Sequence, residues 1–228
     1  MSKENDTVEE AIAKTFEDHS DIFPEDIDLQ DCRIEAMQRF IGNMEGKFVL
    51  DVGCAKGRIT KILAAQGAIA TGIDPSKRLL ALAREQVQNA NFVAGSVANL
   101  PFPDNTFDTV ICIETLEHIP DTKKAIAEMV RVAKPHAQIL IVDKNIFSLH
   151  EKLFIPSVAI KWWAELNGKW FYPRSFPFRE KWFTSIAVRH LLLEHVSSVD
   201  SEYLRAKHNV ILKFLPFFNL FIAWKAIK

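Results

Sequence analysis

The chain has 228 residues, of which 28 are Lys or Arg and 29 are Asp or Glu, so its formal net charge is −1 at pH 7. This balanced charge and a hydrophobic content of 48% are typical of a globular protein; they exclude fibrous and disulfide-framework classes and give no indication of nucleic-acid binding. Three widely spaced cysteines predict reduced thiols rather than disulfides. Seven of the eight glycines precede residue 100, whereas most aromatic residues follow residue 146.

The first 46 residues predict a helical cap made of two helices, Val8–Phe16 and Asp31–Asn43. The N-terminus is acidic and lacks an apolar core, so no signal peptide is expected. The longest apolar run, Phe214–Trp224, is too short to span a bilayer. These features predict a cytoplasmic protein, with at most peripheral contact to a membrane; they say nothing about its oligomeric state.

Residues 47–228 predict a single α/β domain. Short apolar runs alternate with longer amphipathic ones, which is typical of repeated βα units. Ser76 and Asp121 are expected to cap two of the helices, and Pro135 to end the second. We therefore expect a Rossmann-like, doubly wound, mainly parallel seven-stranded sheet with helices on both faces. The expected strands are Phe48–Val52, Ile69–Asp74, Asn91–Ala94, Thr109–Ile113, Gln138–Asp143, Val196–Leu204 and Phe217–Ile227.

The alternation of βα units stops after Asp143, and residues 147–195 are expected to form further helices. Pro156 and Gly168 bracket one helix, residues 157–167, which is apolar on nearly every side and should be covered by other elements. A second helix is expected at about Glu180–Leu193.

The segment VLDVGCAKGRIT, residues 49–60, carries a candidate ligand site. Asp51 ends a predicted strand, and Gly53 and Gly57 lie in the turn that follows, where a ligand can approach the backbone. Asp74 ends the next strand, and a carboxylate there can accept hydrogen bonds from both hydroxyls of a ribose. A nicotinamide dinucleotide fits poorly, because its G-x-G-x-x-G pattern meets Ala55 and Arg58 at the second and third glycine positions.

Four segments together resemble the class I S-adenosylmethionine-dependent methyltransferases, most closely the type 11 group that includes ubiquinone and menaquinone methyltransferases. They are VLDVGCAKG, GIDPS, GSVANLPFPDNTFDTVICIETLEHIPD and RVAKP. The resemblance implies S-adenosylmethionine as cofactor and S-adenosylhomocysteine as product. The cofactor-binding positions that it implies are Asp51, Gly53, Cys54, Ala55, Gly57, Asp74, Pro75, Ser76, Ser96, Val97, Ile113, Glu114 and Arg33.

The resemblance also assigns roles. Asp51, Gly53 and Ala55 would line the amino-acid end of the cofactor, and Asp74 would hold the ribose. Ser96 and Val97 would contact the adenine edge, and Arg33 resembles an upstream Arg that pairs with the cofactor carboxylate.

Three departures from the family pattern stand out. Ala55 replaces the middle glycine, so the turn is expected to avoid positive φ there. Ser96 replaces the usual Asp, which predicts looser or backbone-based adenine recognition. His136 and Ala137 replace two glycines in what is expected to be a surface turn.

His118 is the candidate general base, and a lining histidine that transfers no proton is the alternative. Glu114, Glu117 and His118 also have the spacing of a divalent-metal motif found in some relatives. The same letters are common in metal-free relatives, so a metal site is not favoured.

The resemblance implies that residues 147–195 form an inserted helical lid that covers the acceptor site. The aromatic residues of this expected lid allow three interpretations: a secondary core, a pocket or membrane-facing surface for a lipid-like acceptor, and a stacking platform for RNA. The sequence favours methyl transfer to a small or lipid-like acceptor, at oxygen. An RNA methyltransferase, a non-catalytic cofactor-binding domain and an NAD-type enzyme are the alternatives. The lid candidates are Trp162, Trp163, Trp170, Tyr172, Phe176 and Phe178.

Overall fold

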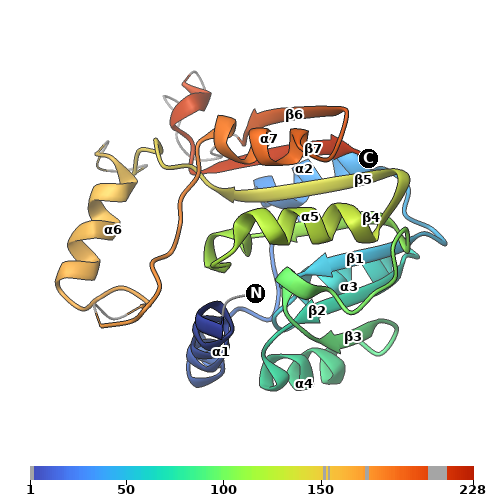
Figure 1. The fold of residues 1–228 in the computed structure, drawn as a ribbon, viewed down its shortest axis with the longest axis horizontal. Coiled ribbons are helices and arrows are strands. Elements are labelled where there is room, and N and C mark those ends of the chain that lie inside the picture. The colour runs from blue at the N-terminus through green and yellow to red at the C-terminus, as the bar shows by residue number, and fades with distance from the viewer. Residues whose placement is uncertain (1–2, 151–152, 154, 173–174, 205–214) are drawn as a thin grey trace.

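The computed structural model describes residues 3–150, 153, 155–172, 175–204 and 215–228. Within this part of the chain, one seven-stranded sheet has the order β3-β2-β1-β4-β5-β7-β6 (Figure 1). The pairs from β3 to β5 are parallel, and β7 is antiparallel to both of its neighbours. The predicted α/β sheet is confirmed. The strands are β1 (Phe48–Val52), β2 (Ile69–Asp74), β3 (Asn91–Ala94), β4 (Phe107–Ile113), β5 (Ala133–Lys144), β6 (Ser198–Tyr203) and β7 (Phe221–Ile227).

Short polar side chains begin several helices. Ser76 accepts a hydrogen bond from the backbone N–H of Leu79, and Asp121 accepts one from that of Lys124, so both expected caps are confirmed. The helices are α1 (Lys3–Asp18), α2 (Cys32–Ile41), α3 (Arg58–Ala65), α4 (Lys77–Gln86), α5 (Thr122–Val132), α6 (Ser157–Leu166) and α7 (Ser185–Leu193). Short 3₁₀ turns are η1 (Ser20–Ile22), η2 (Val97–Asn99), η3 (Leu116–His118) and η4 (Pro216–Phe218).

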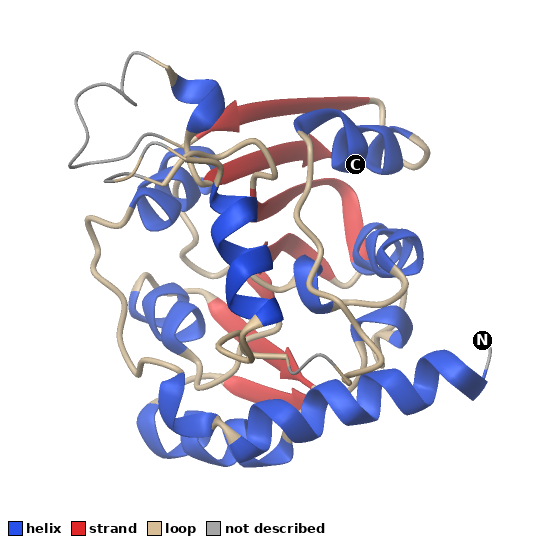
Figure 2. Ribbon diagram, turned by 90° about the vertical axis from the view of Figure 1, so that its left-hand side faces the viewer, coloured by secondary structure: helices blue, strands red, loops and turns tan. Residues whose placement is uncertain are grey.

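Alternate residues of the central strands pack on opposite faces of the sheet. On β4, Val110 and Cys112 join the core that contains α5 and α7, whereas Ile111 joins the core that contains α2 and α3. Strands buried on both faces read as continuous apolar runs, and this explains the sequence pattern of β4 and β5. Figure 2 shows the resulting helices on both sides of the stacked strands.

The two helices of the expected N-terminal cap occupy different places. α2 packs on the sheet face near β5, where Gln138 donates to the carbonyl of Phe40 at 3.0 Å. α1 instead crosses the carboxyl ends of β2 and β3 (Figures 1 and 2), and its Glu17 accepts from the Ser76 hydroxyl at 3.2 Å. Only α1 therefore covers the edge of the sheet where a ligand is expected.

The region after β5 differs from expectation in two ways. α7 begins at Ser185 rather than near Glu180, because residues 180–184 run beside the end of β5, where the Phe183 N–H donates to the Lys144 carbonyl. α6 projects from the body of the molecule (Figure 1), and Trp162 and Trp163 are 68% and 56% exposed. The expectation that other elements cover this helix is wrong for the part of the chain that the structure describes.

Two further boundaries shift. Pro135 lies inside β5 rather than at the helix end, since α5 already ends at Val132 and the register between β4 and β5 changes there. β7 begins at Phe221, because η4 occupies the preceding residues. No described helix combines the length and the apolar character needed to cross a bilayer.

Candidate functional site

A cavity lies at the carboxyl ends of β1, β2 and β4, and the turn after β1 forms its floor. Gly53, Ala55 and Gly57 all have positive φ, of 73°, 46° and 80°. The expectation that Ala55 avoids positive φ is therefore wrong. The Ala55 N–H donates to Asp74 at 3.0 Å, and this bond holds the alanine in a conformation that favours glycine.

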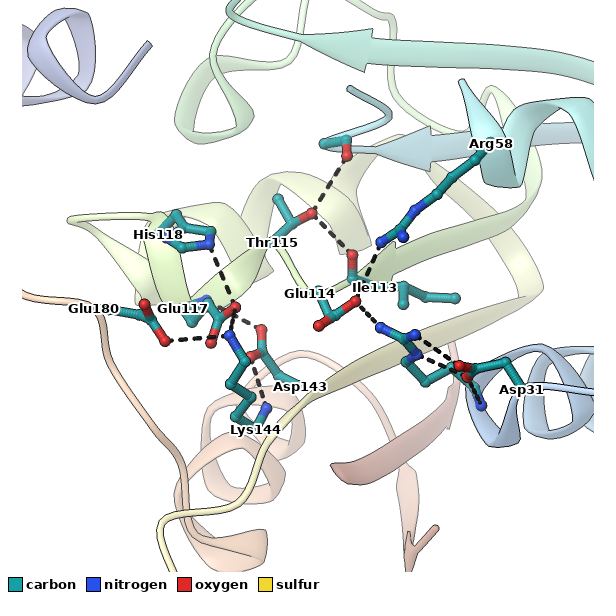
Figure 3. A network of polar contacts seen from close by, with 12 residues as sticks. Asp31, Arg58, Ile113, Glu114, Thr115, Glu117, His118, Asp143, Lys144 and Glu180 are labelled. Carbon is teal, nitrogen blue, oxygen red and sulfur yellow. Dashed lines mark hydrogen bonds and ion pairs between the residues drawn. The ribbon is translucent and has the colours of Figure 1, made fainter. Parts of the chain in front are cut away.

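The turn also approaches the next loop closely. A Cβ added to Gly53 would lie 2.2 Å from the Thr115 side chain. Thr115 follows β4, and its hydroxyl contacts the carbonyls of Gly53 and Ile113 at 3.5 and 3.2 Å (Figure 3). A side chain at position 53 would push the two loops apart and change the shape of the cavity.

Two buried carboxyl groups face this cavity. Asp74 accepts from the N–H groups of Ala55 and Ser76, one at each oxygen. Asp51 accepts from the Thr60 hydroxyl at 2.6 Å. Burial raises the pKa of both carboxyls to about 6, because the charged form loses hydration. Each oxygen can still accept a further hydrogen bond from a ligand hydroxyl or amine.

The outer wall of the cavity comes from β3 and α1. Ser96 and Val97 follow β3, and Glu9 on α1 accepts from the Ser96 hydroxyl at 2.5 Å. Ile12 and Phe16 continue this wall along the same helix. These α1 contacts could not be predicted from the sequence, because no local pattern in a separate helix indicates which strand end the helix will cover.

Glu114, at the end of β4, forms ion pairs with two arginines. Arg58 lies 3.2 Å from its carboxylate, and Arg33 contacts the same oxygen (Figure 3). Arg33 also pairs with Asp31 at 2.7 Å and lies over the Phe221 ring. The structure therefore does not bring Arg33 into the cavity, whereas Arg58 lines it.

Ten of the predicted cofactor residues line this cavity, and three do not. Gly57 shapes the turn, Ser76 caps α4, and Arg33 lies beyond Glu114. Those lining it are Asp51, Gly53, Cys54, Ala55, Asp74, Pro75, Ser96, Val97, Ile113 and Glu114. Lining residues that sequence reasoning missed include Glu9, Ile12, Phe16, Arg58, Leu79 and Thr115.

His118 lies at the other end of the cavity, with both ring nitrogens engaged. Nδ1 is 3.0 Å from the Tyr172 hydroxyl, and Nε2 is 3.3 Å from the Glu117 carboxylate. Glu117 is buried, and Lys144 contacts it at 2.7 Å. Burial alone would raise the pKa of the Glu117 carboxyl, but His118 and Lys144 outweigh burial and hold this pKa below its usual range.

The two carboxylates of the candidate metal motif, Glu114 and Glu117, point in different directions (Figure 3). Glu114 faces Arg58, and Glu117 faces Lys144. The described residues contain no group of three His, Cys, Asp or Glu side chains that could hold a metal ion. The carboxylates of this motif are thus paired with cationic side chains.

A second cavity adjoins the first, and the two share Phe16, Phe23, Arg58, Glu114 and His118 among their lining residues. The residues expected to form the lid occupy different environments near this cavity. Trp170 lines the second cavity, while Tyr172 and Phe178 are buried against Ile12, with Phe176 packed beside them. Trp162 and Trp163 line neither cavity.

Residues 50–141 match the family model described as methyltransferase domain. This stretch contains the turn after β1, both buried carboxyl groups and His118. This part of the chain is similar to a methyltransferase domain.

Known relatives agree with this assignment of the domain. A ubiquinone biosynthesis O-methyltransferase from Alkalilimnicola ehrlichii is 34% identical over 123 residues, which cover 52% of this chain and 50% of that protein. The chain spans about half the length of the curated relatives it matches.

Solved structures share the fold of the methyltransferase domain. An S-adenosylmethionine-dependent methyltransferase from Mesorhizobium loti has a TM-score of 0.69 at 13% identity, covering 87% of this chain and 99% of that one. A Haemonchus contortus phosphoethanolamine N-methyltransferase, solved with S-adenosylhomocysteine and phosphomonomethylethanolamine, has a TM-score of 0.65 at 16% identity; the match covers 87% of this chain and 52% of that one.

The cavity of the methyltransferase domain has the hydrogen-bond acceptors and apolar contacts that S-adenosylmethionine needs. Asp74 and Asp51 offer acceptors for ribose hydroxyls and for an amino group, and the glycine turn lets a ligand approach the backbone. Pro75, Leu79 and Val97 provide apolar contacts for a purine ring. These residues fit the expected cofactor.

Gly53→Ala should weaken the binding of S-adenosylhomocysteine by at least about tenfold, because the added Cβ displaces Thr115 at the cavity floor. Isothermal titration calorimetry measures this loss. Gly46→Ala is the matched control: Gly46 has φ of 71°, close to that of Gly53, but a Cβ there meets nothing within 4 Å. Both variants bear the strain of positive φ, about 1–2 kcal/mol, so equal affinities would refute the close-approach explanation.

Proposed function

We propose that this protein is an S-adenosylmethionine-dependent methyltransferase that acts on a ring oxygen of a small, lipid-like quinone precursor. The observation that carries the proposal is the cavity at the ends of β1, β2 and β4, which joins Asp51, Gly53 and Asp74 to His118. Relatives named ubiquinone biosynthesis O-methyltransferase support the choice of oxygen and of a lipid-like acceptor.

The cofactor would lie along the cavity from Ser96 to His118. Asp74 would accept hydrogen bonds from the ribose hydroxyls, and Asp51 would face the amino-acid end beside the Gly53 turn. Ser96 and Val97 would border the adenine ring, and Ile113 and Glu114 would close the opposite side. When bound, S-adenosylmethionine supplies a methyl group on a positively charged sulfur.

His118 is the proposed general base. A carboxylate only accepts hydrogen bonds, so contact with Glu117 places the ring hydrogen on Nε2 and leaves Nδ1 as the acceptor. With this tautomer, the Tyr172 hydroxyl, 3.0 Å away, donates to Nδ1. An acceptor hydroxyl that replaced it would give its proton to Nδ1 while Glu117 stabilised the imidazolium.

The second cavity is the proposed acceptor site, and residues 147–195 are its proposed lid. Trp170 and Phe171 line this cavity, and Lys144 and Glu180 neutralise one another at its wall, 3.2 Å apart. Aromatic walls exclude water from the reacting atoms, and this exclusion strengthens the electrostatic contacts there. His118 borders both cavities, so it lies where cofactor and acceptor would meet.

The wild-type protein should convert S-adenosylmethionine and a prenylated catechol into S-adenosylhomocysteine and the methyl ether, detected by mass spectrometry. His118→Ala should lower kcat by about 10²- to 10⁴-fold, because it removes the base, with little change in S-adenosylhomocysteine affinity. His190→Ala, at an exposed position of α7, is the control.

Full activity of His118→Ala would contradict the role of the base. A wild-type protein that binds S-adenosylhomocysteine but methylates no oxygen of prenylated or simple catechols would contradict the proposed reaction.

The affinity for S-adenosylhomocysteine should fall by at least about tenfold between pH 7 and pH 5. Ribose hydroxyls bind the ionised form of Asp74, whose pKa burial raises to about 6, so acid converts the site to a form that binds poorly. The same raised pKa makes the ligand-free fold lose stability as pH rises through about 6. Calorimetric titrations across this range measure the effect.

Asp74→Asn should bind more weakly at pH 7 and show a smaller pH dependence, because one of the two buried carboxyls is removed while Asp51, with a pKa also raised to about 6, still titrates. Asp200→Asn, at an exposed position of β6, should retain the wild-type profile. A wild-type profile in Asp74→Asn would rule out the ribose assignment.

We further propose that the exposed side of α6 contacts a membrane surface. Trp162, Trp163 and Leu166 are exposed there, and Lys169 lies 5.1 Å from the Trp163 ring. Exposed tryptophans beside a lysine suit the interface between lipid headgroups and acyl chains. Such contact would bring the enzyme to a lipid-like acceptor.

The wild-type protein should float with anionic phospholipid vesicles, and a Trp162→Ala, Trp163→Ala double variant should bind at least about tenfold more weakly, since each tryptophan would bury a large apolar surface. Flotation assays compare the two proteins. Ile69→Ala, at an exposed apolar residue where β2 begins, is the control. Absence of wild-type binding to both anionic and neutral vesicles would refute this proposal.

A further inference from the structure

α1 brings a carboxylate to the end of the cavity that lies beyond Asp74. Glu9 and Ser96 both line the cavity, and the Ser96 hydroxyl donates to Glu9 at 2.5 Å. Glu17, two turns further along α1, accepts from the Ser76 hydroxyl at 3.2 Å. α1 is thus held at two points, one at the end of β2 and one just after β3, which fixes where Glu9 points.

The sheet defines which part of a nucleoside would reach Glu9. Asp74 pairs in register with Ala94 of the neighbouring strand, so Ser96 lies two residues past that partner. A nucleoside whose ribose binds Asp74 therefore extends its base toward Ser96, away from His118. Pro75, Leu79, Val97 and Ile12 line this part of the cavity and form an apolar slot of the kind that holds a flat ring.

The hydrogen bonds that Ser96 and Glu9 already form determine which groups the edge of that base would meet. The Ser96 hydroxyl donates its single hydrogen to Glu9, and its oxygen accepts a hydrogen bond from the Ala98 N–H at 3.1 Å. Glu9 is a carboxylate and can only accept. This end of the cavity consequently presents side-chain acceptors, and it favours a base edge that carries hydrogen-bond donors.

We infer that Glu9 is a specificity residue for the cofactor and accepts a hydrogen bond from the exocyclic amine of adenine. The inference rests on the proposed use of S-adenosylmethionine. A base with a carbonyl oxygen at that position, such as hypoxanthine, would place one acceptor against another and bind poorly. The expectation of looser adenine recognition at Ser96 overlooks this carboxylate, because it comes from a different element.

The test compares S-adenosylhomocysteine with its inosine analogue, in which a carbonyl replaces the amine, by calorimetry on the whole protein. Wild type should prefer the adenosine form by at least about tenfold, the size expected for a hydrogen bond to a charged group. Glu9→Gln should lose most of this preference, because its amide can also donate to the carbonyl. Glu10→Gln, at an exposed position of the same helix, should behave as wild type.

A second variant moves the carboxylate from α1 to the strand end. Glu9→Gln combined with Ser96→Asp should regain the preference for the adenosine form, which a merely structural role of Glu9 would not produce. An unchanged preference in Glu9→Gln, with the helical circular dichroism of wild type, would overturn the inference. Wild type that binds neither ligand would instead contradict the proposed cofactor.

Discussion

One buried carboxyl group joins the parts of the cavity. Asp74 ends β2, and its two oxygens accept from the Ala55 N–H after β1 and from the Ser76 N–H that begins α4. The first bond holds an alanine at positive φ, and the second fixes the start of a helix. The position of the glycine turn, and with it the floor of the cavity, therefore depends on a residue from the neighbouring strand. The same burial raises the pKa of Asp74 and makes it a strong acceptor once ionised.

Two ion-pair networks join distant segments of the chain to the end of β4. Glu114 binds Arg33 from α2 and Arg58 from α3. Glu117, three residues later, binds Lys144 at the end of β5, and Lys144 also contacts Glu180 before α7. These carboxylates are buried or half-buried and carry cationic partners, which reduces the penalty of desolvation. The spacing that suggests a metal motif in the sequence serves here to anchor loops around His118.

Much of this arrangement could be predicted from local pattern. Apolar runs, caps and glycine turns identify β1, β2, α4 and the turn at Gly53, because each depends on residues near it in the chain. The ends of parallel strands meet at one edge, so Asp51 and Asp74 could be placed together from the fold alone. The conformation of Ala55 could not, since it depends on a hydrogen bond to a residue 19 positions away.

The contributions of separate helices were beyond local reasoning. Glu9 belongs to no recognisable motif, and Arg33 contacts Glu114, which lies 81 positions away in the sequence. The exposure of Trp162 also escapes prediction, because an apolar helix normally implies burial. For Glu9 and Arg33, the contact partner lies far away in the sequence. For α6, the described residues cover only part of the helix.

Phe16 of α1 connects the two cavities. Its ring lines both cavities, meets His118 edge-on at 5.1 Å and stacks on Phe171 at 5.3 Å. Glu9 lies two turns away on the same helix, at the far end of the first cavity. A displacement of α1 that released a nucleoside bound beside Glu9 would thus also loosen the packing over the histidine. In the proposed enzyme, exchange of the spent cofactor and exchange of the methylated product would therefore be coupled through this single helix.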